Sequence, residues 1–163
     1  MTTRYVLSRR PLLAGLAAAS VVAPAAAMGQ ARAAARSLQV FKTPGCGCCE
    51  GWAEHLRANG FACEVTEHAE LARVKDRLGV PESLRSCHTG TLEGYVVEGH
   101  VPAAALERLL IERPAAVAGL AVPGMPMGSP GMPSPHPEAY EVVAFGADGS
   151  QRTFMRFVGE AIA

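Results

Sequence analysis

Residues 43–49 read Thr43-Pro44-Gly45-Cys46-Gly47-Cys48-Cys49 and lie between a predicted strand and a predicted helix. The strand covers residues 37–42, where apolar side chains alternate with polar ones. The helix begins near Cys48 and runs to residue 59, and a second alternating strand follows over residues 61–66. A strand–helix–strand unit of this kind is right-handed. The sequence therefore predicts three cysteines at the start of the helix in such a unit.

Two further helices and two further strands are predicted in the next part of the chain. Helices are predicted over residues 70–78 and 103–112, because apolar residues recur there at helical spacing. Between them, residues 92–97 predict a strand, Glu98-Gly99 a turn, and His100-Val101 the start of a short return strand. The resulting order β-α-β-α-β-β-α is typical of thioredoxin-like domains. The predicted fold class is therefore α/β and thioredoxin-like.

The C-terminal part differs in composition from the residues before it. Seven of the chain's twelve prolines lie between Pro114 and Pro137, with methionines among them. Such a stretch cannot form a central strand or a helix, so an irregular, partly polyproline-like path is expected. Residues 140–145 and 151–157 then predict a hairpin. The predicted parts are a thioredoxin-like metal-binding domain (38–118), a Pro/Met-rich segment (119–137) and a C-terminal hairpin packed on the domain (138–163).

The first 33 residues are typical of a secretory signal peptide. They carry four arginines and no acid, and an apolar, alanine-rich run covers residues 12–27. Arg9 and Arg10 indicate the twin-arginine type, which exports folded proteins in bacteria. The alternative is an uncleaved membrane anchor, but this run is interrupted by Pro24 and is shorter than the roughly 20 residues that a spanning helix needs. We therefore expect a periplasmic protein without stable membrane insertion once residues 1–33 are cleaved.

The charge of the chain excludes some classes of function. The 163 residues include 15 basic and 15 acidic side chains, and removal of the four arginines in residues 1–33 leaves 11 against 15, a net charge of −4. A chain without a basic excess is not expected to bind nucleic acid. The sequence contains no phosphate-binding loop and no H-E-x-x-H motif, which disfavours a nucleotide enzyme or an ordinary hydrolase.

All five cysteines follow the predicted signal segment. Cys46 and Cys49 form a C-x-x-C pair, which at this place in a strand–helix–strand unit is the thioredoxin redox motif. Cys48 adds one thiol more than a dithiol switch requires, and thiolates select ions such as Cu(I) and zinc. Because adjacent cysteines diverge on a helix, a site with several ions fits this spacing more easily than a single ion does. Three interpretations stay open: a metal site, a redox dithiol, and a structural disulfide with a spare thiol.

Further candidate ligands lie outside the cysteine cluster. In a thioredoxin-like fold, the loop that carries Cys87 and His88 lies against the start of the first helix, so both residues could bind a metal there. Met125 and Met127 could present thioethers to Cu(I), or they could pack a Pro-rich flap on the core. His100, beside the predicted turn, is either a ligand or an ordinary surface histidine. The remaining residues of these types are expected to be a buried, inert thiol, Cys63, and solvated histidines, His55, His68 and His136.

Several motifs together resemble those of a known family. They are the residues 43–49 quoted above, Trp52, Ser86-Cys87-His88-Thr89, the stretch from Gly94 to Pro102, and Val122-Pro123-Gly124-Met125-Pro126. Over residues 38–135 the chain resembles the domain of unknown function 411, a family that includes periplasmic copper-resistance proteins of the CopG type. The resemblance implies a thioredoxin-like fold and copper binding through the C-x-C-C cysteines and the later cysteine, here Cys46, Cys48, Cys49 and Cys87.

The resemblance and the residue chemistry together predict copper handling. The predicted metal ligands are Cys46, Cys48, Cys49, Cys87, His88, Met125 and Met127. The expected metal is Cu(I), as one ion or more, with zinc as the alternative, and the expected partners are metal ions and other periplasmic copper proteins. The expected function is copper sequestration, transfer or resistance rather than enzymatic catalysis; an enzyme of this sequence would be a thiol or copper oxidoreductase. Two alternatives stay open: a periplasmic thiol–disulfide oxidoreductase using Cys46 and Cys49, and a zinc-stabilised structural module.

The two adjacent arginines give the first prediction. A twin-arginine signal is read by a receptor rather than by bulk charge, so Arg9→Lys/Arg10→Lys should trap the precursor in the cytoplasm. Immunoblots of periplasmic and cytoplasmic fractions measure the distribution. An unchanged periplasmic yield would reject the twin-arginine type and leave a general secretory signal.

Overall fold

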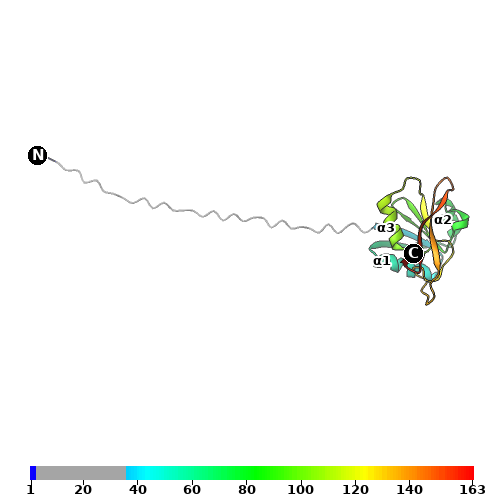
Figure 1. Ribbon diagram of the computed structural model, residues 1–163. Helices are drawn as coiled ribbons and strands as arrows, with labels where there is room; N and C mark the ends of the chain where they lie inside the picture. The colour runs from blue at the N-terminus through cyan, green and yellow to red at the C-terminus, as the bar shows by residue number, and fades with distance from the viewer. Residues whose placement is uncertain (3–35) are drawn as a thin grey trace. The chain divides into compact units, whose positions relative to one another are not determined.

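The computed structural model describes residues 36–163 together with Met1 and Thr2 (Figure 1). The predicted signal segment, apart from these two residues, lies outside the described residues. No helix in the described part of the chain is both long and apolar enough to cross a membrane.

One mixed sheet of eight strands organises residues 36–163, in the order β2-β1-β3-β4-β5-β6-β7-β8. The strands are β1 Arg36–Lys42, β2 Phe61–Glu67, β3 His88–Leu92, β4 Tyr95–Glu98, β5 Gly119–Ala121, β6 Ala139–Phe145, β7 Gln151–Val158 and β8 Ala161–Ile162. The helices are α1 Gly47–Ala58, α2 Leu71–Arg77 and α3 Ala103–Glu112, with a short 3₁₀ turn at Glu82–Leu84. β1 is parallel to β2 and β4 to β5, and the other neighbours are antiparallel. The α/β class and the predicted order of elements through α3 agree with this architecture.

The predicted position of the hairpin turn between the second and third helices was wrong. The turn lies at Glu93-Gly94, not at Glu98-Gly99, because Leu92 pairs directly with Tyr95. Both turn residues have positive φ, 47° and 90°, as the tight two-residue turns of hairpins require. Two Glu-Gly pairs compete in the sequence, and the alternation of side chains alone did not distinguish them. As a result β3 begins at His88, and His100 follows β4 instead of starting a strand.

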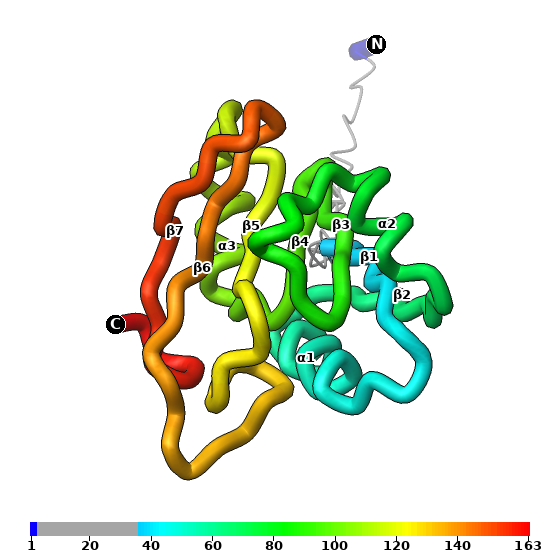
Figure 2. The backbone as a smooth tube through the Cα atoms, turned by 90° about the vertical axis from the view of Figure 1, so that its right-hand side faces the viewer, coloured from blue at the N-terminus to red at the C-terminus, as the bar shows by residue number. Residues whose placement is uncertain are grey.

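The expectation that residues 119–137 contain no central strand was also wrong at their start. Gly119–Ala121 form β5, which is buried and lies between β4 and β6. These three residues precede the first proline of the segment, so their N–H groups are free to join the sheet. The remaining residues, 122–138, are irregular as predicted and run past the start of α1 on their way to β6 (Figure 2).

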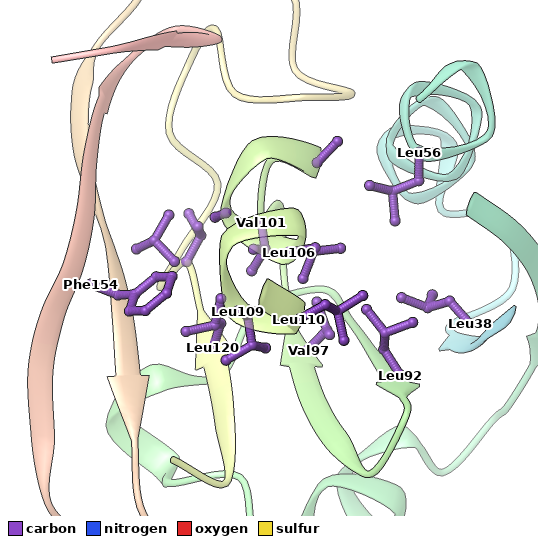
Figure 3. Packing of buried hydrophobic residues seen from close by; sticks show 14 of the residues in the cluster. Leu38, Leu56, Leu92, Val97, Val101, Leu106, Leu109, Leu110, Leu120 and Phe154 are labelled. Atoms are coloured by element: carbon purple, nitrogen blue, oxygen red, sulfur yellow. The ribbon is translucent and has the colours of Figure 1, made fainter. Parts of the chain in front are cut away.

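The predicted C-terminal hairpin is confirmed as β6 and β7, which pair from Ala139 to Phe145 with one irregularity at Val142/Val143. It extends the same sheet, because β6 also pairs with β5. Helices α1 and α3 pack on one face of this sheet, where Leu56, Leu106 and Leu109 meet strand residues (Figure 3). The segment after α2 packs on the other face. Val97 of β4 belongs to the hydrophobic cluster under α1 and α3, whereas its neighbour Val96 packs with Val80 and Leu84. Full burial of a leucine stabilises the fold by about 1.5–3 kcal/mol.

Gly119 generates a stability prediction. A Cβ at this position would lie 2.3 Å from the carbonyl oxygen of Val96 and 2.6 Å from Cζ of Phe145. Gly119→Ala should therefore force β4 and β5 apart and destabilise the protein by about 2 kcal/mol, in the range of overpacked cores.

Thermal and urea unfolding of the metal-free protein measure this effect. Gly47→Ala is the matched control, since a Cβ there meets no atom within 4 Å and its φ is not positive; its effect should stay within about 0.5 kcal/mol. Equal stabilities of the two variants would contradict the packing described for β5.

Candidate metal centre

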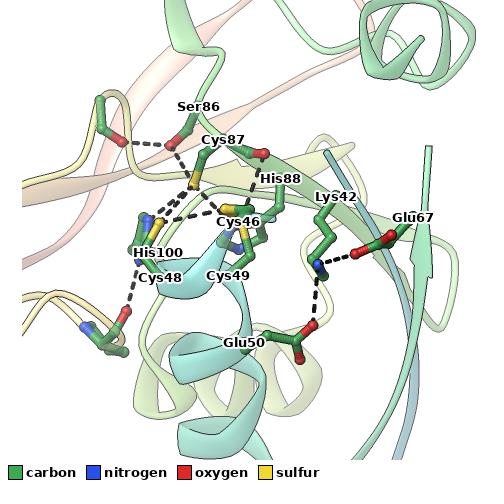
Figure 4. The surroundings of a disulfide bond; sticks show 12 residues. Lys42, Cys46, Cys48, Cys49, Glu50, Glu67, Ser86, Cys87, His88 and His100 are labelled. Carbon is green, nitrogen blue, oxygen red and sulfur yellow. Dashed lines mark hydrogen bonds and ion pairs between the residues drawn. A yellow bond between two sulfur atoms is a disulfide. The ribbon is translucent and has the colours of Figure 1, made fainter. Parts of the chain in front are cut away.

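The C-x-C-C sequence forms the start of α1. Gly45 has a φ of +73° and turns the chain out of β1, and Cys46 is the residue before the helix, with no side-chain hydrogen bond to the first turn. The first N–H groups of a helix have no partners within it, so this end of α1 favours anionic groups. Buried Lys42 at the end of β1 pairs with Glu50 of α1 (3.2 Å) and Glu67 of β2 (2.9 Å), which fixes the loop between strand and helix (Figure 4).

Four cysteines meet at this helix end (Figure 4). Cys46 and Cys49 are joined by a disulfide, with their Cα atoms 5.4 Å apart. The free thiol of Cys48 lies 3.5 Å from Sγ of Cys46 and 3.9 Å from Sγ of Cys87. The sulfur atoms of all four residues lie within 4.8 Å of one another. The structure therefore brings Cys87 to the C-x-C-C cysteines, as the sequence predicted.

Two histidines lie beside Cys87. Its Sγ is 3.3 Å from Nδ1 of His88 and 3.1 Å from Nε2 of His100, and both rings are fully buried. Cys87, His88 and His100 form a second group whose ligand atoms lie within 4.8 Å. The two groups share Cys87, so sulfur and nitrogen donors form one continuous cluster.

One hydrogen bond fixes the orientation and the protonated nitrogen of the His100 ring. Its Nδ1 lies 2.7 Å from the carbonyl oxygen of Pro130, which can only accept a hydrogen bond. Nδ1 therefore carries the proton, and the lone pair of Nε2 faces Cys87. A backbone carbonyl that fixes the imidazole in this way is the usual partner of a metal-binding histidine.

His88 carries an unpaired buried atom. Its ring packs against Trp52 with centroids 4.2 Å apart, and its Nε2 has no hydrogen-bond partner among the described residues. An unpaired buried nitrogen is costly, and a bound ligand can remove that cost. The other ring nitrogen, Nδ1, faces Sγ of Cys87 (3.3 Å), so it is this atom, together with the soft sulfur donors, that fits a site for a metal ion.

Burial favours the uncharged forms of Cys87, His88 and His100 by shifting the pKa of each. Burial raises the pKa of the Cys87 thiol to about 12, and the neighbouring Cys48 thiol adds to the effect. Burial also lowers the pKa of His88, with nearby His100 and Lys75 contributing, and lowers the pKa of His100. At neutral pH the histidines therefore have free lone pairs, and a metal that binds Cys87 must displace its proton.

The remaining candidates are two exposed methionines and Cys63. Met125 and Met127 are exposed, at 51% and 39%, although the nearby carbonyl oxygen of Gly124 accepts a hydrogen bond from Ser86 (2.5 Å). Their role as ligands stays a prediction. Cys63 lies on β2 opposite Leu38 and belongs to neither group.

Two histidines differ from the simplest expectation. His100, which the predicted ligand set leaves out, is a buried neighbour of Cys87 and not a surface residue. Its place within the Gly94–Pro102 motif is the sequence signal that could have identified it. His55 was expected to be solvated, but its ring is largely buried and Nε2 accepts a hydrogen bond from the N–H of Ala103.

Comparison with known proteins identifies the family of this chain. Residues 84–132 match the model of a family described as a protein of unknown function, DUF411. A solved structure described as copper resistance protein CopG, form 1, is 44% identical over 76% of this chain and 98% of its own, with a TM-score of 0.72. The chain belongs to the DUF411 family of CopG-type proteins.

A second form of the same copper resistance protein is similar to the same extent. It is 44% identical over 75% of this chain and 98% of its own, with a TM-score of 0.71. No curated protein is similar enough to the chain to count as a relative. The relatives thus carry a name that refers to copper resistance, and they match this chain over almost their whole length.

The position of Cys87 between the two groups generates a prediction about affinity. Thiolate is a better donor than imidazole for a soft ion such as Cu(I). Cys87→Ser should therefore cost more Cu(I) affinity than His88→Ala, and Cys63→Ser should cost little because Cys63 lies outside the cluster.

Competition with a Cu(I) chelator under reducing, oxygen-free conditions ranks the three variants. Circular dichroism confirms that each variant is folded before its affinity is compared. Loss of copper from Cys63→Ser but not from Cys87→Ser would contradict the assignment of the cluster.

Proposed function

We propose that this chain is an exported protein that binds Cu(I) through Cys46, Cys48, Cys49 and Cys87 and serves copper sequestration, transfer or resistance. The observation that carries the proposal is the convergence of Cys87 on the C-x-C-C cysteines at the start of α1. Four sulfur donors within 4.8 Å form a soft donor set, which Cu(I) prefers. The 44% identity with a protein described as a copper resistance protein favours copper over zinc.

The fold and the signal segment support an exported, thioredoxin-like protein. The strand order β2-β1-β3-β4, with α1 and α3 on one face, supports a thioredoxin-like domain in which the cysteines would occupy the redox position. Arg9 and Arg10 in a positive, apolar N-terminal segment support export by the twin-arginine route. The irregular segment after β5 and the C-terminal hairpin would belong to the same exported unit.

More than one ion fits the cluster. The sulfur group and the Cys87–His88–His100 group share one thiol, so Cys87 can bridge two ions while other donors complete each site. Exposed Met125 and Met127 would supply thioethers near the outer side of the cluster, where a partner protein could deliver or remove Cu(I).

A second candidate function is thiol–disulfide exchange, and one observation favours it. Cys46 and Cys49 form a disulfide at the N-terminus of α1, as they would in an oxidised thioredoxin-like enzyme. Copper binding by all four cysteines requires this bond to be reduced, with two electrons from a thiol reductant. The two functions therefore differ in what they require of Cys48, which lies outside the disulfide.

Cys48→Ser separates the two functions. A dithiol catalyst needs Cys46 and Cys49 and should tolerate the change, whereas a thiolate–copper cluster loses a sulfur ligand. We expect the variant to bind fewer copper ions per chain than the wild-type protein, as measured by metal analysis together with a count of free thiols.

Reduction of a model disulfide substrate is measured on the same samples. Cys63→Ser is the matched control, because it removes one thiol without touching the cluster. If Cys48→Ser binds copper as the wild-type protein does and disulfide exchange persists, the oxidoreductase is the correct assignment.

A further inference from the structure

A buried ion pair lies directly behind the candidate ligands. Nζ of Lys75 on α2 is 2.5 Å from Oε1 of Glu98 on β4, and the two side chains are 6% and 0% exposed. The same ammonium group donates to Oγ1 of Thr89 (2.7 Å), and the Thr89 hydroxyl donates to Oε2 of Glu98 (2.5 Å). The N–H of Ser86 donates to Oε1 of Glu98 (2.6 Å). Both oxygens of this carboxylate are therefore engaged.

These bonds hold the segment that carries two of the ligands. Ser86 and Thr89 flank Cys87 and His88 in the sequence. The Glu98 carboxylate accepts a hydrogen bond from each of them, so it fixes the segment on both sides of the two candidate ligands. The backbone continues the attachment, since the N–H of Gly99 donates to the carbonyl oxygen of His88 (3.0 Å).

The backbone also links His100 to Glu98. It follows Glu98 by two residues, and the carbonyl oxygen of Glu98 is itself fixed by the N–H of Val122 (2.9 Å). The three residues Cys87, His88 and His100 are thus all held relative to one buried carboxylate.

Stability of the fold is a weak reason for keeping a charged pair buried here. Both side chains are almost fully buried, so folding removes both charged groups from water. Desolvation commonly offsets the attraction within a buried ion pair, and an apolar pair of similar volume stabilises a fold at least as well. Every other ion pair in the described part of the chain has at least one partner that is a third or more exposed, so this one differs from the rest.

We propose that Lys75 and Glu98 are positioning residues of the metal centre, whose ion pair sets the placement of Cys87, His88 and His100 before a metal arrives. The inference rests on the proposed copper-binding function. Donors that are held in place lose less freedom on binding, and groups that orient metal ligands typically account for a 10- to 100-fold difference in metal affinity, which gives an order-of-magnitude expectation here.

Paired substitutions test the role without leaving a buried charge unpaired. Lys75→Met/Glu98→Leu replaces the ion pair by apolar side chains and removes the acceptor for Ser86 and Thr89. We expect this variant to fold and to lose Cu(I) affinity about tenfold or more. Lys75→Met/Glu98→Gln keeps an amide oxygen and an amide N–H at the same place, and should recover most of the affinity.

The readouts are chelator competition for Cu(I) and the X-ray absorption spectrum of the copper-loaded protein. The spectrum counts sulfur and nitrogen neighbours of copper, which a purely structural role of the pair would not change in a folded variant. Arg108→Met/Glu112→Gln removes an exposed ion pair of α3 and is the matched control, with wild-type affinity and spectrum expected.

The outcomes separate the two proposals. If the wild-type protein takes up no Cu(I), the proposed function fails and the positioning role fails with it. If the wild-type protein binds Cu(I) and folded Lys75→Met/Glu98→Leu matches it in affinity and spectrum, only the positioning role is overturned. If that variant does not fold, Thr89→Val decides, because it keeps the ion pair and the shape but removes two hydrogen bonds; a several-fold loss of affinity supports the role and an unchanged affinity overturns it.

Discussion

The antiparallel pairing of β1 with β3 is the constraint on which the cluster depends. This register sets Lys42, the last residue of β1, opposite His88, the first residue of β3. Cys46 lies four residues beyond the C-terminal end of β1, and Cys87 immediately precedes β3. Because the two strands are antiparallel neighbours, both cysteines lie at the same end of this strand pair. A shift of one residue would exchange the faces of every side chain on β3 and would separate Cys87 from the helix that carries the other cysteines.

Local pattern was enough to predict most elements, whereas the four-cysteine group was predicted from the expected thioredoxin-like arrangement and the family resemblance, because spacing alone does not bring Cys87 to the other three. The alternation in residues 61–66 and the helical spacing in 103–112 each match one observed element. The turn at Glu93-Gly94 was missed because a second Glu-Gly pair follows five residues later, and only the pairing partners decide between them. His100 could not be assigned with certainty for the same reason, since its environment follows from where β4 ends.

The Lys75–Glu98 pair shows a further limit of sequence patterns. Lys75 lies in a short helix with charged neighbours, where a solvated side chain is the ordinary expectation. Its burial arises from three segments that meet only in the folded chain: α2, the start of β3 and the end of β4. Candidate ligands have recognisable residue types, whereas the groups that orient them do not, and contacts between distant segments reveal them.

The hydrogen bond from His100 to Pro130 determines how much of the chain the metal centre needs. The Pro130 carbonyl belongs to the irregular segment between β5 and β6, which also contacts α1 closely: a Cβ on Gly131 would lie 2.4 Å from the carbonyl oxygen of Cys48. That segment is held at both ends by strands of the common sheet. The smallest fragment able to reproduce the environment of His100 is therefore longer than the seven helices and strands from β1 to α3, because β5 and β6 anchor the segment that carries the hydrogen-bond partner of this histidine.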